Sequence, residues 1–237
     1  KELARKIAVV FGGGSGIGKE FCRKLAKEGA HVVIADRDFD AAQHIERELS
    51  KQLGNEVFMS VEADITDRVS VKKAIKKSIL HFGGLDILVN TAAVFIQPDK
   101  ENSFSDELWD HTLTTNIRSN YIVTEVFADV VNEQGSEGAV VLTSSANAVV
   151  PKSGSEPYDI SKAAVNHLIR ELAVRYSPRI RVNGVSPATV INGSSMFPRD
   201  RLIKSLKKYE IPFNKDDETS TLSKKLAGYY ANRTLTH

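Results

Sequence analysis

The chain is poor in cysteine, in net charge and in long apolar runs, and each of these shortages excludes a class of protein. Cys22 is the one cysteine, so no disulfide can form within the chain, which fits a reducing compartment. No apolar run approaches the ~18 residues of a membrane-spanning helix. With 32 basic and 30 acidic residues, the chain has no overall charge that would attract nucleic acid or an anionic membrane. We therefore expect a cytoplasmic globular protein that acts on a small molecule.

The chain does contain what a large α/β domain needs. It has 237 residues, of which 41% are hydrophobic, enough to bury a core without disulfides or metal. Short, β-branched apolar runs alternate with amphipathic stretches, a pattern typical of βαβ units around a parallel sheet. The six expected strands are Ile7–Phe11, His31–Ala35, Val57–Ala63, Ile87–Val89, Ala139–Thr143 and Ile180–Val185. The expected helices between them are Gly16–Glu28, Phe39–Leu53, Val69–Phe82, Ser105–Val131 and Tyr158–Tyr176.

Glycines crowd the junction of the first expected strand and helix, in the segment FGGGSGIG at residues 11–18. A strict G-x-G-x-x-G pattern fails because no register places all three glycines. The phosphate loop G-x-x-x-x-G-K-[ST] fails at Glu20, where a hydroxyl would have to hold Mg²⁺. The spacing G-x-x-x-G-x-G fits Gly12, Gly16 and Gly18. Such glycines let backbone N–H groups approach a pyrophosphate at a helix N-terminus, although a turn without a ligand is the alternative.

An acidic residue at the end of the second expected strand supports a nucleotide ligand. Asp36 lies 18 residues after Gly18. A carboxylate there can accept hydrogen bonds from both hydroxyls of an adenosine ribose and repels a 2′-phosphate, although Arg37 could soften that repulsion. Together with the glycine loop, Asp36 favours NAD over NADP as the cofactor. Taken alone, it fits an ordinary helix-capping acid equally well, because Asp38 and Asp40 lie nearby.

Four polar residues form the candidate catalytic group. Tyr158 and Lys162 are spaced i and i+4 near the start of an expected helix, so both lie on one face. An ammonium beside a phenol favours the phenolate, which could act as a general base in alcohol oxidation and as an acid in carbonyl reduction. Ser145 follows the fifth strand, where its hydroxyl could bind the substrate oxygen. Asn116, on the long preceding helix, could anchor a water in a proton relay near Lys162.

Taken together, these residues resemble the short-chain dehydrogenase/reductase family over about residues 5–192. The segments that carry the resemblance are Gly12–Gly18, Asp36, Asp64–Ile65, Asn90–Ala93, Asn116, Ser145, Tyr158, Lys162 and Asn183–Pro187. The family's fold implies a Rossmann-like, doubly wound parallel sheet of strand order 3-2-1-4-5-6-7 between two layers of helices. It also implies a homo-oligomer, a dimer or a tetramer.

The resemblance assigns a set of cofactor contacts. Asp64 and Ile65 would flank the adenine, Asn90 would steady the central strand, and Pro187 and Val190 would meet the nicotinamide. The full set of predicted cofactor-binding residues is Gly12, Ser15, Gly16, Ile17, Gly18, Asp36, Arg37, Asp64, Ile65, Asn90, Ala92, Ala93, Tyr158, Lys162, Pro187 and Val190. No metal site is expected, because the six histidines show no ligand spacing.

The sequence departs from the family pattern at several positions. Phe11 replaces the threonine that usually precedes the first glycine, so a hydroxyl that ties the loop is lost. Thr91 and Ala93 replace the asparagine and glycine of the usual N-N-A-G. Ala188 replaces a glycine, and Asn192 occupies the place of a threonine that holds the carboxamide. None of these changes removes a catalytic group.

The composition becomes polar after Pro187, with two helical candidates, Arg199–Tyr209 and Thr219–Asn232, and no convincing seventh strand. We therefore predict a dinucleotide-binding catalytic domain over residues 1–192 and a helical substrate-loop segment of the same domain over residues 193–237. Arg199 and Arg201 could meet an anionic group on a substrate there, or simply begin an exposed helix. The absence of the family's last strand leaves dimer packing through that strand in doubt.

Two stretches of the tail, residues 193–201 and 229–235, resemble the dehydrogenase half of bacterial bifunctional rhamnulose-1-phosphate aldolase/alcohol dehydrogenase proteins. The resemblance implies lactaldehyde or a similar small hydroxy-aldehyde as substrate, and an aldolase domain fused to the parent protein. A start at Lys1 instead of methionine is what an excised half would show. The alternatives are a stand-alone family member, a catalytically silent dinucleotide-binding module and, less favoured, a nucleotide hydrolase.

Overall fold

The computed structural model describes residues 1–98, 103–191 and 197–231. The chain divides into two compact units, Lys1–Pro187 and Ala188–His237. The predicted assignment of residues 193–237 to the same domain as the first 192 stays a prediction.

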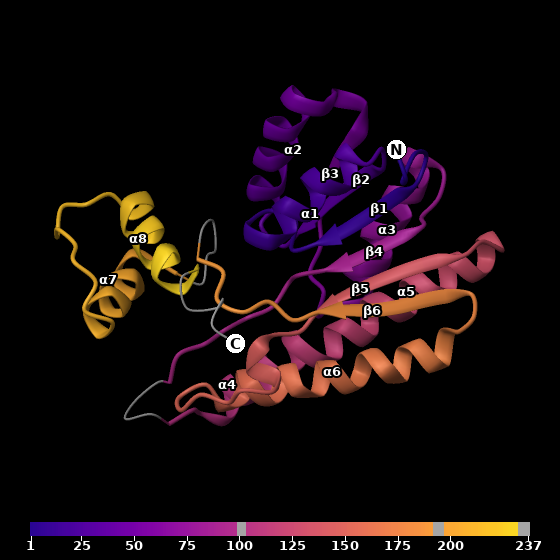
Figure 1. The fold of residues 1–237 in the computed structure, drawn as a ribbon. Coiled ribbons are helices and arrows are strands. Elements are labelled where there is room, and N and C mark those ends of the chain that lie inside the picture. The colour runs from indigo at the N-terminus through magenta and orange to yellow at the C-terminus, as the bar shows by residue number, and fades with distance from the viewer. Residues whose placement is uncertain (99–102, 192–196, 232–237) are drawn as a thin grey trace. The chain divides into compact units, whose positions relative to one another are not determined.

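The first unit is built on a parallel sheet of six strands in the order β3-β2-β1-β4-β5-β6 (Figure 1). The strands are β1 (Ile7–Phe11), β2 (His31–Asp36), β3 (Phe58–Glu62), β4 (Ile87–Asn90), β5 (Gly138–Thr143) and β6 (Ile180–Val185). All six predicted strands are present, and their order agrees with the family order as far as β6. Among the described residues the sheet ends at β6, where Ile180 and Val182 are buried while Arg181 and Asn183 are exposed.

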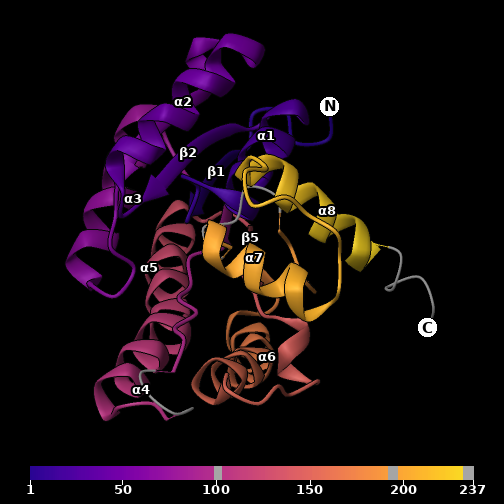
Figure 2. The ribbon, with the colours of Figure 1, turned by 90° about the vertical axis from the view of Figure 1, so that its left-hand side faces the viewer.

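Helices cover both faces of this sheet and make three layers (Figures 1 and 2). They are α1 (Gly16–Lys27), α2 (Phe39–Leu53), α3 (Arg68–Phe82), α4 (Asp106–Leu113), α5 (Ser119–Gln134) and α6 (Glu156–Tyr176). Short helical turns η1 (Asn55–Val57) and η3 (Ala146–Ala148) lie in two of the connections. One core contains α1 and α2 residues with one face of the strands, and the other contains α3, α5 and α6 residues with the opposite face.

The strand residues divide between these two cores by simple alternation. In β1, Val9 and Phe11 belong to the core of α3, α5 and α6, while Val10 belongs to the core of α1 and α2. Successive side chains of a strand point to opposite faces of the sheet, so a strand covered on both faces must be apolar throughout. All five residues of β1 are buried. The predicted Rossmann-like, doubly wound α/β fold is therefore confirmed.

The prediction of one long α-helix over Ser105–Val131 is wrong, because a π-helical turn interrupts the α-helix. The structure has α4, then a π-helical turn η2 over Thr114–Arg118, then α5, which continues to Gln134. A π turn adds one residue to a helical turn, is rare, and frequently occurs at functional sites. Side-chain hydrogen bonds from Asn116 to a distant part of the chain accompany the widened turn, and sequence periodicity cannot register such contacts.

The second unit is a pair of helices, α7 (Arg199–Lys208) and α8 (Thr219–Ala231). Leu202 and Leu206 of α7 pack against Leu222 and Leu226 of α8, with Ile191 in the same cluster. The apolar spacing of three and four residues explains why each stretch forms a helix that buries one face. Across the described residues of both units, no helix is long and apolar enough to span a membrane.

Candidate active site

The candidate site lies where the strands end. The strands are parallel, so the residues that follow β1, β2, β4 and β5 come together at one edge of the sheet, where doubly wound folds bind ligands. Ser145 follows β5 and begins η3, and its hydroxyl accepts a hydrogen bond from the Asn147 backbone N–H at 3.2 Å. The turn η3 packs against α6, the helix that carries Tyr158 and Lys162. The first unit thus brings these three predicted catalytic residues to the same edge.

Tyr158 and Lys162 lie on one face of α6, as their spacing predicts. The Lys162 Nζ is 5.5 Å from the centre of the Tyr158 ring. The Tyr158 ring also packs edge-on with Phe95, at a centroid distance of 4.9 Å. Tyr158 is half-buried. The contacts with Lys162 and Phe95 position the Tyr158 ring, while the side chain stays partly exposed.

Lys162 is almost fully buried, with 2% of its surface exposed. Its Nζ donates a hydrogen bond to the Thr143 carbonyl oxygen at 2.8 Å. Burial lowers the pKa of Lys162 from 10.5 to about 8, because removal from water disfavours the charged form. The Ser144 hydroxyl also donates to the Lys162 carbonyl at 3.0 Å. Lys162 is therefore fixed to the end of β5 by both its side chain and its backbone.

Asn116 lies in the π turn η2 and is fully buried. Its Nδ2 donates to the Val94 carbonyl and its Oδ1 accepts from the Val94 N–H, both at 2.9 Å. The same Nδ2 donates to the Ser161 hydroxyl at 3.0 Å, and that hydroxyl donates to the Tyr158 carbonyl at 2.7 Å. The side chain thus links the segment after β4 to the helical turn that carries Tyr158. The role of Asn116 in a water relay stays a prediction.

A chain of buried amides continues from Asn116 into the centre of the sheet. Asn120 Nδ2 donates to the Asn116 carbonyl at 2.7 Å, and Asn120 Oδ1 accepts from Asn90 Nδ2 at 2.8 Å. Asn90 Oδ1 in turn accepts from the Ala92 N–H at 3.2 Å. Buried polar groups that are hydrogen-bonded to one another in this way favour one arrangement of the elements that carry them. The role of Asn90, to steady the central strand, stays a prediction.

Asp159 was not found by sequence reasoning, although it follows Tyr158 directly. It is buried, and its carboxylate accepts from Asn147 Nδ2 at 2.7 Å and from the Lys152 backbone N–H at 2.8 Å. These bonds tie the loop after Ser145 to the first turn of α6. The only available signal was an acid near a helix start, which indicates a cap as readily as a loop anchor.

The glycine loop approaches its own backbone closely, which explains its composition. Gly12 and Gly16 have φ values of +76° and +49°, which favour glycine. A Cβ atom on Gly18 would lie 2.0 Å from the Gly12 carbonyl oxygen, so only glycine fits where α1 crosses the start of the loop. Ser15 is exposed and precedes α1, and its side chain makes no capping hydrogen bond. The helix α1 thus begins at the edge of the sheet, with Ile17 in its first turn. That turn contains no acidic residue.

Asp36 faces this loop across the end of β2. Its Oδ2 accepts from the Gly14 N–H at 2.9 Å, and its Oδ1 accepts from the Asp38 N–H at 3.0 Å. The alternative role of helix cap belongs to Asp38, whose side chain accepts from the Ala41 N–H. Asp36 therefore joins β2 to the glycine loop, and Arg37 beside it is exposed.

The other predicted cofactor contacts also follow the strand ends of the first unit. Ile65 is buried in the core, and Ala92 and Ala93 are half-buried after β4. Burial opposes the charge of Asp64, but hydrogen bonds from the Thr66 N–H and hydroxyl outweigh it and hold the pKa of Asp64 below its usual value. The Pro187 carbonyl accepts from the Ala146 N–H at 3.0 Å, which joins the end of β6 to the turn after Ser145.

Some predicted positions belong to the second unit or lie outside the described residues. Val190 is in the second unit. Asn192 lies outside the described residues, as do residues 193–196 and 232–235 of the two tail stretches. Arg199 donates to the carbonyl oxygens of Lys215 and Asp217, each at 2.6 Å, and Arg201 lies 4.5 Å from the centre of the Phe197 ring. Arg199 thus joins α7 to the loop before α8.

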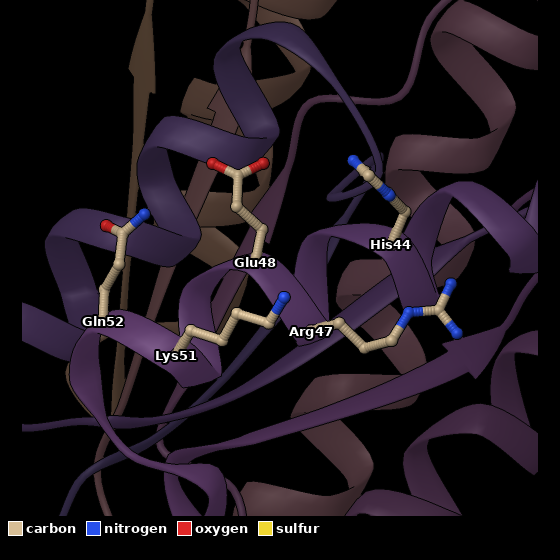
Figure 3. A pocket seen from close by; sticks show the side chains of 5 residues that line it. All are labelled: His44, Arg47, Glu48, Lys51 and Gln52. Carbon is tan, nitrogen blue, oxygen red and sulfur yellow. The ribbon is translucent and has the colours of Figure 1, made fainter.

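A hollow on the opposite side of the sheet is separate from these residues. It is lined by five side chains of α2, namely His44, Arg47, Glu48, Lys51 and Gln52 (Figure 3). Glu48 pairs with Lys19 at 2.8 Å and with Arg23 at 3.2 Å, so these groups join α2 to α1. Because α1 and α2 cover the face opposite α6, this hollow contains none of the candidate catalytic groups.

The structure also bears on nucleophilic cysteine, phosphate-loop and metal chemistry. Cys22 is fully buried against β2 and α2 residues, and burial raises the pKa of its thiol, so it is packed and not nucleophilic. Glu20, the residue that breaks the phosphate-loop pattern, is exposed and accepts two hydrogen bonds from Arg23. Within the part of the chain that the structure describes, no group of three histidine, cysteine or acidic side chains could hold a metal ion.

The fold and this edge define a Rossmann-like protein of the oxidoreductase class. Residues 6–199 match the family model described as short chain dehydrogenase, so the chain belongs to that family. It is 32% identical over 198 residues to the uncharacterized oxidoreductase YuxG of Bacillus subtilis, covering 83% of this chain and 28% of that one. It is 31% identical over 190 residues to human dehydrogenase/reductase SDR family member 4, covering 79% and 67%.

A solved structure agrees with this assignment. The 3-ketoacyl-(acyl-carrier-protein) reductase of Brucella melitensis, complexed with NADH, is 27% identical and superposes with a TM-score of 0.73. The match covers 95% of this chain and 90% of that one. The fold of the family implies a nicotinamide dinucleotide as cofactor.

Proposed function

We propose that this chain transfers a hydride between NAD and a small alcohol or aldehyde, using Ser145, Tyr158 and Lys162. The observation that carries the proposal is the Lys162 ammonium, held 5.5 Å from the centre of the Tyr158 ring and bonded to the end of β5, two residues before Ser145. Removing a lysine from water costs free energy, so a buried lysine beside a half-buried phenol is an arrangement that stability alone does not favour. It is the arrangement that a proton-transfer site needs.

Residues of this chain would carry out the proton transfer. In reduction, the Tyr158 phenol would give its proton to the carbonyl oxygen of an aldehyde and become a phenolate. In oxidation, the Tyr158 phenolate would take the proton of an alcohol, and in both directions the Ser145 hydroxyl would hold the reacting oxygen by a hydrogen bond. The Lys162 ammonium would stabilise the phenolate between these events. The cofactor, when bound, supplies or accepts the hydride. Asp159 would act only by holding the loop after Ser145. Asn116 would hold the helical turn that carries Tyr158 and would anchor the water of a proton relay near Lys162.

The residues present fit a dinucleotide. The close approach of Gly18 to Gly12 leaves no room for a side chain where a pyrophosphate would meet the loop. The start of α1 has no acid in its first turn and no side-chain cap, so its N–H groups suit an anion. Asp36 lies at the end of β2, the place from which a carboxylate reaches an adenosine ribose.

We expect Asp36 to set the preference for NAD. In Asp36→Asn, the ratio of the NADP dissociation constant to that of NAD should fall about tenfold or more. Two unit charges about 4 Å apart repel by about 1 to 4 kcal/mol, depending on solvent exposure, and the amide removes that repulsion. The amide oxygen can still accept from the Gly14 N–H, so the loop should remain in place, while the bond from the Asp38 N–H is lost. Fluorescence titration of both cofactors measures the ratio.

Asp40→Asn is the matched control, since Asp40 is an exposed acid in the first turn of α2. Its ratio should equal that of the wild type. Equal or tighter binding of NADP by the wild type would mean that Arg37, and not Asp36, decides the preference.

The proposed substrate is lactaldehyde or a similar small hydroxy-aldehyde, in a parent protein that also carries an aldolase domain. The support is the resemblance of residues 193–201 and 229–235 to bifunctional aldolase/dehydrogenase proteins. The length of YuxG is also compatible with a second domain, because its 198 matched residues lie within a chain of which this one covers 28%. We propose a homo-oligomer for the same parent.

We expect the parent protein to oxidise or reduce L-lactaldehyde with measurable turnover. The assay follows nicotinamide absorbance with lactaldehyde, simple secondary alcohols and sugar alcohols, and the intact mass of the parent protein reports the additional domain. Turnover of a bulky steroid or acyl substrate with none of lactaldehyde would contradict the proposed substrate. It would leave the dehydrogenase proposal standing, because that depends on Ser145, Tyr158 and Lys162.

A further inference from the structure

Two departures from the family pattern meet at one point of the structure. Phe11 stands where a threonine usually ties the glycine loop, and Thr91 stands where an asparagine is usual. Phe11 is fully buried and belongs to the core beneath α3, α5 and α6. Its side chain therefore serves the core and supplies no hydrogen bond to the loop.

A hydroxyl is present beside position 11, on the residue that follows the neighbouring strand β4. Thr91 Oγ1 lies 3.0 Å from the Phe11 carbonyl oxygen and 3.2 Å from the Gly12 carbonyl oxygen. Its one proton can serve either acceptor or be shared by both. The Thr91 backbone N–H also donates to the Phe11 carbonyl, at 2.9 Å. Thr91 thus holds the two residues at which β1 becomes the loop.

Sheet register brings Thr91 to this place. In the parallel pairing of β1 with β4, Phe11 lies opposite Asn90, so the next residue along faces the first residues of the loop. The position is crowded. A Cβ atom added to Gly12 or to Gly18 would lie 2.7 Å from Thr91 Oγ1. The hydroxyl therefore contacts the start of the loop and the first turn of α1 together.

We propose that the Thr91 hydroxyl replaces the hydroxyl lost at position 11 and acts as a positioning residue for the pyrophosphate of the cofactor. It does so by holding the carbonyl groups of Phe11 and Gly12, so that the N–H groups of the following loop point outward at the helix start. This inference rests on the proposed function, because it assigns a role in cofactor binding. Without the hydroxyl the loop would populate other conformations, and the apparent affinity would fall with the fraction that remains competent.

Binding of ADP-ribose tests the proposal, because this ligand carries the pyrophosphate without the nicotinamide. In Thr91→Val its dissociation constant should rise about three- to tenfold, the loss typical of one hydrogen bond. Thr91→Ser, which keeps the hydroxyl, should bind within about twofold of the wild type. Thr124→Val is the matched control, since Thr124 is a fully buried threonine whose hydroxyl has no hydrogen-bond partner among the described residues. It should bind as the wild type does.

Amide hydrogen exchange in the free protein gives a second readout that needs no ligand. Exchange at Gly12–Gly16 should speed up in Thr91→Val and not in Thr91→Ser. Wild-type affinity and exchange in Thr91→Val, or equal losses in Val and Ser, would overturn the proposal. If Thr91→Val does not fold, Thr91→Ala is used instead. Alanine has no γ-methyl group in the place of the hydroxyl, so no apolar group is pressed against the two carbonyl oxygens. Failure of the wild type to bind ADP-ribose would instead contradict the proposed function, and the exchange data would then decide the role of Thr91.

Discussion

Replacing Tyr158 by phenylalanine should lower turnover by about 10²- to 10⁴-fold, the range typical of general acid–base catalysis, while the NAD dissociation constant stays nearly unchanged. The phenol hydroxyl is the group that we propose gives and takes the proton. The ring itself should remain in place, because its edge-on contact with Phe95 and its position near Lys162 do not need the hydroxyl. Steady-state kinetics on the parent protein and a fluorescence titration of NAD measure the two quantities.

Tyr176→Phe is the matched control for this experiment. Tyr176 is the last residue of the same helix, and its buried hydroxyl has no hydrogen-bond partner within the described parts of the chain. Removing that hydroxyl should leave turnover unchanged. Near-normal activity in Tyr158→Phe would refute the assignment of Tyr158 as the proton donor and acceptor.

Replacing Lys162 by methionine should change both turnover and the pH dependence of the free energy of unfolding. Turnover should fall by about 10²-fold or more, because the phenolate loses its cation. Stability should change in a way that depends on pH, because burial lowers the pKa of Lys162 to about 8 in the folded chain, against 10.5 for an exposed lysine. The cost of burying this charge is about 3 kcal/mol when the group is protonated in both states.

The direction of the pH dependence follows from proton counting. Between about pH 8 and 10.5 the unfolded chain binds the Lys162 proton and the folded chain has released it, so the free energy of unfolding of the wild type rises with pH there. Below pH 8 the full cost remains, and above 10.5 it is gone. Methionine carries no charge at any pH. The free energy of unfolding of Lys162→Met, relative to the wild type, should therefore be about 3 kcal/mol higher at pH 7 than at pH 11.

Urea unfolding at several pH values measures this difference. Lys73→Met is the control, because Lys73 is exposed on α3 and its substitution should give the same difference from the wild type at every pH. A pH-independent difference for Lys162→Met would mean that the buried lysine keeps an ordinary pKa. Unchanged turnover would remove Lys162 from the proposed mechanism.

Much of the first unit follows from the sequence alone. A strand such as β1, covered by helices on both faces, must be a short run of buried apolar residues, and a covering helix must repeat its apolar positions every three or four residues. These local requirements predicted all six strands and most helices to within a few residues. The i, i+4 spacing also placed Tyr158 and Lys162 on one face, because that spacing is a property of any α-helix.

The sequence determined the alternation of elements, the glycine loop and the residue types at the strand ends, because each depends on neighbours along the chain. The tertiary structure alone decided what Asn116, Thr91 and Asp159 hold. Each of these side chains bonds to a backbone or side-chain group that another element supplies, Val94 for Asn116, Phe11 and Gly12 for Thr91, and Asn147 and Lys152 for Asp159. The π turn at Thr114–Arg118 belongs with them, since Asn116 bonds across the fold from within it. The contacts of Asn116 and Thr91 join residues that become neighbours only when the sheet assembles. Those of Asp159 form only when the loop after Ser145 packs against α6, so a local sequence pattern does not encode them.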